Sequence, residues 1–254
     1  MAIRSEVLPV SVPDVRAVRW WSDELYAGVK ETYSIARLES GRLEWWCRGR
    51  VWPCGPGSLL LIQPGDVHRD VSRDGPSTLQ IVTLPAEAVE SATGKLERLE
   101  PRLVAGDQRA RPFERLHAAV AQRSARLEME VAVADAIMAL RGVNQGTTGR
   151  TRPVRRALEL LHARLAEPVT LDDLANHAVL DKFHLCRAFR AQIGMPPHAY
   201  LTRLRIMRAK ALLVSGVRPS DIAPQVGFYD QSQLNRHFRR IVGTTPARYA
   251  RGVH

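Results

Sequence analysis

The C-terminal part of the chain contains one short module twice, and this repeat constrains the fold more than any other feature of the sequence. At first the offset is 48 residues, because Leu174, Ala175 and Ala178 recur as Ile222, Ala223 and Val226. After one inserted residue the offset is 49, and Leu185, Arg187, Phe189, Arg190, Gly194, Pro197 and Tyr200 recur as Leu234, Arg236, Phe238, Arg239, Gly243, Pro246 and Tyr249. Self-similarity at a fixed offset indicates one supersecondary unit that is used more than once.

The first copy predicts two helices with a tight turn between them. Thr170 and Asp173 form a capping-box-like start, because their side-chain oxygens can accept hydrogen bonds from backbone N–H groups at the start of a helix. A turn near Val179-Leu180 leads to Asp181, a favourable N-cap for a second helix that ends at Gly194. A short helix, a tight turn and a second helix with a basic outer face form a helix-turn-helix.

The second copy repeats this pattern, with Gly227 at the turn, Asp230 as N-cap and Gly243 at the end of the second helix. Pro224 lies inside its first helix, where the missing N–H removes about one hydrogen bond if the helix begins near Asp221. A longer helix joins the copies, with apolar positions at Tyr200, Leu204, Met207, Ala211 and Val214 and an end at Gly216. We expect this helix to set the separation of the two modules.

The positive charge of the chain is concentrated where the repeat lies. The formal net charge is +11; residues 1–150 contain 20 Lys and Arg against 19 Asp and Glu, whereas residues 151–254 contain 17 against 7. Neutralisation of phosphates is the main source of non-specific affinity for nucleic acids. An anionic membrane surface would attract the same charge, so it is the repeat that favours DNA, with no role at a membrane.

The chain before the repeat has a different character, and we predict two domains, residues 1–141 and 153–254, joined by a linker at 142–152. Residues 1–85 show short strand patterns, including 32–38 and 43–47 around a turn at Ser40-Gly41, and a turn at Pro64-Gly65-Asp66. Short strands with such turns indicate an antiparallel barrel or sandwich. The predicted fold class is therefore α+β, with an all-α second domain.

Residues 113–140 show helical periodicity with two apolar faces. One face contains Leu116, Ala119 and Val120, and the other contains Met129, Val133, Ala136, Ile137 and Leu140. Either face could pair with a second copy of the chain, which would make it a homodimer, or both could cover the barrel. The sequence leaves these alternatives open, together with a dimer that forms through the barrel.

Several classes of protein are disfavoured. The N-terminus lacks the apolar stretch of a signal peptide, and no apolar run approaches the roughly 18 residues of a membrane span, which favours the cytoplasm. Cys47, Cys54 and Cys186 form neither a disulfide framework nor a metal-ligand spacing. A metal-dependent barrel enzyme would need converging histidines, and only His68 lies before residue 117. We expect no catalytic activity, no metal and no cofactor.

The most specific motif of the chain is a run in the second copy: Ile222-Ala223, Val226-Gly227-Phe228, Asp230-Gln231-Ser232, Leu234, Arg236, Phe238-Arg239-Arg240, Gly243, Thr245-Pro246 and Tyr249. This run resembles the DNA-binding domain of the arabinose-operon regulator (AraC/XylS-type) family of bacterial transcription factors, and the resemblance covers residues 153–251. Pro224 departs from the family pattern, as does Leu234, where the family often has an aromatic residue. The resemblance implies an N-terminal cupin-like barrel followed by dimerisation helices.

Carried over by position, the resemblance also implies which side chains meet DNA. Base edges would be read by Phe183, Cys186 and Arg187 in a helix near 181–192, and by Ser232, Gln233 and Arg236 in a helix near 230–242. Arginine can grip guanine, glutamine can grip adenine, and an aromatic ring can contact the thymine methyl group. Phosphates would be contacted by Lys182, Arg190, Asn235, Arg239 and Arg240. The alternative is an ordinary basic, solvated surface.

Four side chains of the barrel are candidates for binding a small-molecule effector, namely Tyr33, Arg37, Trp45 and His68. Tyr33 and Arg37 share one face of a strand and could form an anion clamp, whereas His68 could point into the barrel mouth. Core packing is the alternative for Trp45.

The sequence as a whole predicts an effector-responsive, sequence-specific regulator that reads two successive major-groove segments of double-stranded DNA. The resemblance implies activation by recruitment of RNA polymerase. Binding of an effector would then change the DNA affinity through a coupling free energy between two sites. The alternatives are a constitutive DNA-binding protein whose barrel binds nothing, and a metal-dependent barrel enzyme.

Overall fold

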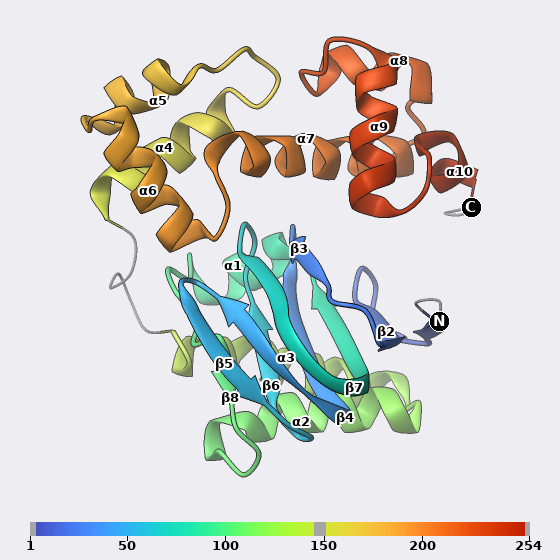
Figure 1. The fold of residues 1–254 in the computed structure, drawn as a ribbon. Coiled ribbons are helices and arrows are strands. Elements are labelled where there is room, and N and C mark those ends of the chain that lie inside the picture. The colour runs from blue at the N-terminus through green and yellow to red at the C-terminus, as the bar shows by residue number, and fades with distance from the viewer. Residues whose placement is uncertain (1–3, 145–150, 252–254) are drawn as a thin grey trace. The chain divides into compact units, whose positions relative to one another are not determined.

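The computed structural model describes residues 4–144 and 151–251 and divides into two compact units, Met1–Gly149 and Arg150–His254 (Figure 1). The described part of the first unit contains strands and helices, and that of the second contains helices. The predicted α+β fold with an all-α C-terminal domain is confirmed. Of the predicted linker, residues 145–150 lie outside the described residues.

The strands of the first unit form one antiparallel, eight-stranded sheet within the described residues. The order is β1-β2-β7-β4-β6-β8, with β3 paired to β7 and β5 paired to β4. The strands are β1 Arg4–Leu8, β2 Arg16–Ser22, β3 Ala27–Val29, β4 Tyr33–Cys47, β5 Arg50–Cys54, β6 Leu59–Ile62, β7 Val67–Leu84 and β8 Arg102–Leu103.

Two long strands, β4 and β7, pair with each other and organise the sheet. The first part of β4 pairs with β6 and its last part with β5, while β7 pairs first with β3 and then with β2. The predicted turn at Ser40-Gly41 is wrong, because β4 continues through it with register shifts of the bulge type. Gly41 has φ +86°, and a Cβ there would lie 2.6 Å from the carbonyl oxygen of Pro76. The glycine allows this close approach of β4 and β7.

Three helices cover one face of the sheet, namely α1 Ala86–Thr93, α2 Arg111–Gln122 and α3 Arg126–Gly142, with a short 3₁₀ turn at Gln108–Ala110 before α2. Their apolar side chains share a core with Tyr33, Ile35 and Val82 of the sheet. Both helical faces that were considered for pairing with a second copy lie in this core: Leu116, Ala119, Val120, Met129, Val133, Ala136, Ile137 and Leu140 are buried. These faces therefore cover the sheet.

The second unit contains the predicted pair of helix-turn-helix modules. Its helices are α4 Arg152–Ala163, α5 Leu171–Ala178, α6 Lys182–Ile193, α7 Pro197–Val214, α8 Pro219–Gln225, α9 Gln231–Val242 and α10 Pro246–Arg251. The first module is α5–α6 and the second is α8–α9, and α7 connects them (Figure 1). Leu185 and Phe189 of α6, and Leu234 and Phe238 of α9, are fully buried, as the repeat predicts.

Local capping explains where the module helices begin. The capping box of Thr170 and Asp173 is present, and the Asp181 carboxylate accepts hydrogen bonds from the backbone N–H groups of Phe183 and His184. In the second module, the Asp230 carboxylate accepts from the backbone N–H of Gln233 at 2.6 Å. These bonds satisfy donors that have no partner within a helix.

The first helix of the second module differs from the prediction. It begins at Pro219 instead of near Asp221, and Pro224 lies in its last turn, next to its final residue Gln225. The helix therefore ends almost as soon as the proline interrupts it. Among the described residues, no helix is long and apolar enough to cross a membrane.

Candidate nucleic-acid interface

The outer face of α6 presents one aromatic and two basic side chains. Phe183 is 69% exposed although it is apolar, and Arg187 and Arg190 are also exposed. Cys186 is half-buried between them. Lys182, which the resemblance assigns to a phosphate, lies with its Nζ 3.1 Å from the Asp172 carboxylate of α5, so part of its charge is compensated within the module.

The outer face of α9 is polar and more basic. Ser232, Asn235, Arg236, Arg239 and Arg240 are exposed, whereas Gln233 is half-buried. The Oε1 of Gln233 accepts a hydrogen bond from the backbone N–H of Tyr229 at 2.9 Å. Gln233 therefore ties the residue before the Asp230 N-cap to the first turn of α9, and its amide oxygen is already engaged.

The offset of 49 residues decides which positions of α6 and α9 are equivalent. It pairs Phe183 with Ser232, Cys186 with Asn235, Arg187 with Arg236 and Arg190 with Arg239. Gln233 is equivalent to His184, whose Nδ1 lies 3.2 Å from the Asp181 carboxylate at the other cap. The structure thus brings together an exposed set on each helix in which Asn235, not Gln233, corresponds to Cys186.

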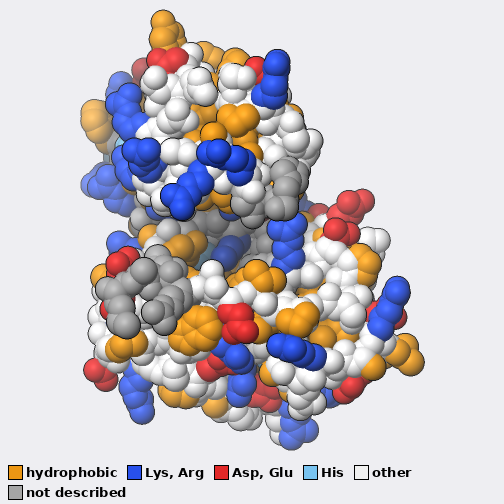
Figure 2. Space-filling model, turned by 90° about the vertical axis from the view of Figure 1, so that its right-hand side faces the viewer, with side chains coloured by type: hydrophobic (Ala, Val, Ile, Leu, Met, Phe, Trp, Pro, Cys, Tyr) orange, Lys and Arg blue, Asp and Glu red, His pale blue; other side chains and the backbone are white. Residues whose placement is uncertain are grey.

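Four arginines of these two faces have no acidic partner among the described residues. Within residues 4–144 and 151–251, Arg187, Arg190, Arg236 and Arg239 form no ion pair. Figure 2 shows one face of each unit, and on that of the second unit Lys and Arg side chains gather with few acidic ones among them. An unpaired guanidinium can bind a guanine edge or a phosphate without first losing a partner.

The ring of His237 in α9 is placed to accept a hydrogen bond. Its ring stacks on Phe228, with 5.5 Å between centroids and 17° between planes, and its Nδ1 accepts from the Arg240 guanidinium at 3.0 Å. Burial lowers the pKa of His237, and the positive charges of Arg240 and Arg236 lower it further. A neutral ring can accept the Arg240 hydrogen bond.

The structure separates the four candidate effector residues of the first unit into two sites. Tyr33 is buried in the core beneath the helices, and Arg37 lies on the same side, close enough to His117 of α2 to influence its charge. Trp45 and His68 belong together, with ring centroids 6.0 Å apart, in a second buried cluster that includes Leu38, Leu43 and Leu79. The proposed clamp of Tyr33 and Arg37 therefore does not share a site with Trp45 and His68.

A buried ion pair beside this cluster was not found from the sequence. The Arg73 guanidinium lies 2.5 Å from the Asp70 carboxylate, with side-chain exposures of 4% and 8%. It also donates to the carbonyl oxygen of Ser22 at 2.9 Å and lies 5.2 Å from the Trp20 ring centre. The sequence did not predict a role for Asp70 or Arg73. Both lie in the long strand β7, where a charged residue is expected to face solvent.

An open cavity of about 410 Å³ lies between β4, β5 and β7, with Arg42, Glu44, Asp74 and Arg102 among its lining residues. None of the four candidate effector residues lines it. Within the described residues, no group of three or more His, Cys, Asp or Glu side chains is arranged to hold a metal ion.

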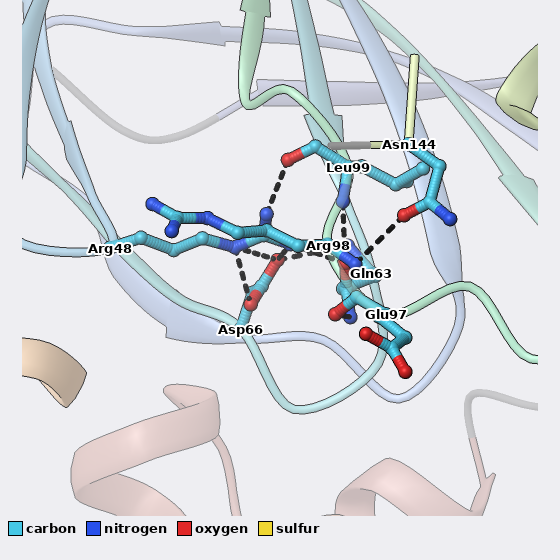
Figure 3. Close-up of polar contacts among 7 residues, drawn as sticks. All are labelled: Arg48, Gln63, Asp66, Glu97, Arg98, Leu99 and Asn144. Carbon is cyan, nitrogen blue, oxygen red and sulfur yellow. Dashed lines mark hydrogen bonds and ion pairs between the residues drawn. The ribbon is translucent and has the colours of Figure 1, made fainter. Parts of the chain in front are cut away.

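A buried polar network ties the end of α3 to the sheet (Figure 3). The Arg48 guanidinium binds the Asp66 carboxylate, the Leu99 carbonyl oxygen and the Gln63 amide oxygen. The Asn144 amide oxygen accepts from the Arg98 backbone N–H at 3.0 Å. Burial lowers the pKa of Arg48, but the charge and hydrogen bonds of Asp66 raise it more, so the net pKa lies above its ordinary value.

Comparisons with known proteins agree with this arrangement. Residues 174–252 match the family described as helix-turn-helix domain, and residues 24–137 match the AraC-like ligand binding domain. The chain is 31% identical over 215 residues to the HTH-type transcriptional regulator YbfI of Bacillus subtilis, covering 80% of this chain and 78% of that protein. It is 33% identical over 97 residues to the HTH-type transcriptional activator AarP of Providencia stuartii, covering 38% of this chain and 72% of that one.

The fold is similar to that of ToxT from Vibrio cholerae, with a TM-score of 0.58 and 12% identity, covering 97% of this chain and 100% of that chain. The two modules, their basic faces and these matches define a helix-turn-helix transcription regulator with a separate ligand-binding domain. Within that class, the chain belongs to the AraC-type family, so the resemblance noted from its sequence is confirmed.

Proposed function

We propose that the protein is an effector-responsive activator that reads two successive major-groove segments of double-stranded DNA with α6 and α9. The observation that carries the proposal is the pair of equivalent arginines, Arg187 and Arg236, exposed and without an ion pair among the described residues of a strongly basic unit. A recognition helix reads base edges in the major groove with such side chains. We propose no enzymatic activity, and we place the protein in the cytoplasm, where a bacterial regulator meets DNA.

The proposed base-reading residues are Phe183, Cys186 and Arg187 on α6, and Ser232, Asn235 and Arg236 on α9. Asn235 joins this set because it is equivalent to Cys186 and exposed, whereas the amide oxygen of Gln233 is engaged at the helix cap. The side-chain NH₂ group of Gln233 can still donate a hydrogen bond to a base. Phosphate contacts are assigned to Lys182, Arg190, Arg239 and Arg240, which set the position on DNA without reading sequence.

Selection of bound sites from random DNA with the full chain tests this assignment. Arg187→Ala and Arg236→Ala are each expected to lose about 1–3 kcal/mol on the selected site and to relax base preference at one position. The two relaxed positions are expected to lie about 10 base pairs apart, one turn of DNA. Arg155→Ala, an exposed arginine of α4, is the matched control and is expected to bind as the wild type does. An equal loss on specific and random DNA would place the base-reading face elsewhere.

A homodimer is the proposed assembly, and α3 supplies its surface. Leu127, Val131 and Met138 are 73%, 53% and 50% exposed, and with exposed Ala134 they form one stripe at helical spacing. An antiparallel partner helix would place Leu127 against Met138 and Val131 against Ala134, so the stripe is self-complementary under two-fold symmetry. Sedimentation is expected to give a dimer for the wild type and a monomer for Val131→Glu. Ala121→Glu, on the exposed face of α2, is expected to stay dimeric; a dimeric Val131→Glu would exclude this surface.

A small-molecule effector is proposed to bind the first unit and to change DNA affinity, with RNA polymerase as the partner in activation. The match to an AraC-like ligand binding domain supports the effector, and the activator AarP among the relatives supports activation. A solved ToxT structure is described as bound to an unsaturated fatty acid, so fatty acids belong in a thermal-shift screen of small metabolites. A ligand that binds only the folded state raises the melting temperature. If none of the compounds raises the melting temperature, a constitutive DNA-binding protein is favoured.

A further inference from the structure

The loop between α4 and α5 directly precedes the first module in the sequence, but it lies against the second module. Leu165 packs against the core of the second module, which includes Ile222 and Phe238. In Figure 1 this loop reaches from α4 toward α8. The two modules are therefore joined at a second place besides α7.

The turn of the second module is shaped to receive this loop. Gly227 has φ +81°, and a Cβ there would lie 2.7 Å from the carbonyl oxygen of Ala166 and 2.9 Å from its Cα. Its equivalent in the first module, 48 residues earlier, is Val179, which has φ 55° and is 73% exposed. The same left-handed turn thus carries a largely exposed valine in the first module and, in the second, a glycine against which the loop lies. The close approach, more than the turn itself, requires the glycine.

Arg205 of α7 holds the loop in place. Its Nε donates to the Leu165 carbonyl oxygen and its Nη2 to the Glu167 carbonyl oxygen, both at 2.8 Å. A planar guanidinium can span two carbonyl groups in this way, which a lysine ammonium cannot do with the same geometry. The Arg205 guanidinium also lies 5.9 Å from the Phe228 ring centre. Burial lowers the pKa of Arg205.

The contacts continue from Phe228 into the recognition helix. Phe228 stacks on His237 of α9, which directly follows Arg236 in the sequence. A continuous set of contacts therefore runs from the loop before the first module, through Arg205 and Phe228, to α9. We name residues 165–167, Arg205, Gly227, Phe228 and His237 the inter-module brace.

We propose that the inter-module brace fixes the orientation of α9 relative to α6, so that the two helices accept their DNA segments at one spacing only. Arg205 and Gly227 are then positioning residues for sequence recognition. Ile206, Ala209 and Leu213 of the 18-residue α7 pack in the core of the second module, so the freedom that remains is a bend of α7 between the two modules. A second connection removes that freedom before binding, and preorganisation of this kind lowers the entropic cost of the complex. The inference rests on the proposed function of α6 and α9.

Binding of the full chain to a series of operators tests the brace. The operator is first selected from random DNA, and one or two base pairs are then inserted or removed between the two segments. We expect the wild type to lose about tenfold in affinity per inserted or removed base pair, because each one turns the segments out of phase. Arg205→Met is expected to bind all spacings within about threefold of one another. The matched control is Arg208→Met, an exposed arginine on the same helix that is expected to keep the wild-type preference.

Gly227→Ala is the second variant, because it disturbs the same contact without removing a charge. If it also flattens the spacing preference while its melting temperature stays within a few degrees of the wild type, the brace is a positioning device. Should one variant fail to fold, the other carries the test. Wild-type spacing preference in a folded Arg205→Met or Gly227→Ala would overturn the brace. If the wild type itself binds no DNA, the proposed function is overturned instead.

Discussion

Two arginines of the first unit and two of the second show opposite uses of the same side chain. In the first unit, Arg48 and Arg73 have side chains that are 9% and 4% exposed, and each forms an ion pair with a buried aspartate. In the second unit, Arg187 and Arg236 are exposed and form no ion pair within the described residues. A buried guanidinium must be paired, because its desolvation costs several kcal/mol. An exposed, unpaired one costs folding little and remains available to a nucleic acid.

This contrast separates residues that hold the fold from residues that act. Substitution in the buried pairs is expected to change folding, whereas substitution on α6 or α9 is expected to change binding at nearly constant stability. All five tryptophans lie before residue 53, so tryptophan fluorescence follows unfolding of the first unit selectively.

The largest expected effect comes from breaking the Arg48–Asp66 pair. Asp66→Asn leaves the Arg48 charge buried without a counter-charge and is expected to lower the free energy of unfolding by about 3–5 kcal/mol. Urea unfolding of the full chain, followed by tryptophan fluorescence, measures this change. The control is Asp135→Asn, whose ion pair with Arg115 is exposed and is expected to contribute less than about 1 kcal/mol. A similarly small loss for Asp66→Asn would mean that burial does not make the Arg48–Asp66 pair more important for folding than an exposed ion pair.

The next effect concerns a buried histidine. Burial lowers the pKa of His117 to about 3, with a smaller contribution from the positive charge of Arg37. The Nδ1 of His117 lies 2.9 Å from Oε1 of Gln80, so the neutral ring donates this hydrogen bond. In the unfolded chain the histidine titrates near pH 6.5. Its contribution to stability is complete above that pH and is lost as the pH falls toward 3.

This titration is expected to cost about 2 kcal/mol of unfolding free energy between pH 7 and pH 5. His117→Gln keeps an amide donor for Gln80 and is expected to remove that part of the pH dependence, which urea unfolding at the two pH values measures. His198→Gln, an exposed histidine of the second unit, serves as control and is expected to leave the dependence unchanged. An unchanged pH dependence in His117→Gln would refute the assignment.

The smallest effect sharpens the comparison within α9. Asn235→Ala is expected to lose about 1 kcal/mol of discrimination at one base pair, the lower end of the range for a base contact. Gln233→Ala removes the hydrogen bond to the Tyr229 backbone and is expected to lower the melting temperature with less change in base preference. Site selection and thermal melting of the two variants decide between them. A loss of base preference in Gln233→Ala but not in Asn235→Ala would show that Gln233 reads the base.

The helices of the second unit could be predicted closely, because the residues that begin, end and orient each helix lie close together in the sequence. Asp181 and Asp230 cap α6 and α9, Gly194 and Gly243 end them, and the buried Leu and Phe positions recur within one or two turns. Helix caps and helical periodicity involve residues no more than about four positions apart. The two helix-turn-helix modules and their outward arginines therefore follow from the sequence.

The candidate effector site could not be predicted in the same way, because the faces of a long strand depend on its bulges. Alternation places every second residue on one face, but β4 shifts register near Leu38, Ser40 and Arg42, and again between Glu44 and Trp45. Each bulge changes the alternation. As a result Tyr33 and Arg37 cannot be related to Trp45 by counting residues, and the structure places them in separate clusters.

The sequence by itself determined the duplicated modules, the basic half and the family, because caps, periodicity and charge are properties of short segments. Tertiary structure alone decided which arginines are buried with carboxylates, which helical faces cover the sheet and where the loop after α4 packs. Leu165 and Gly227 lie 62 positions apart, and Arg48 and Leu99 lie 51 positions apart. Such contacts form only when the chain folds, because their energy comes from burial and from pairing of groups that no local pattern connects.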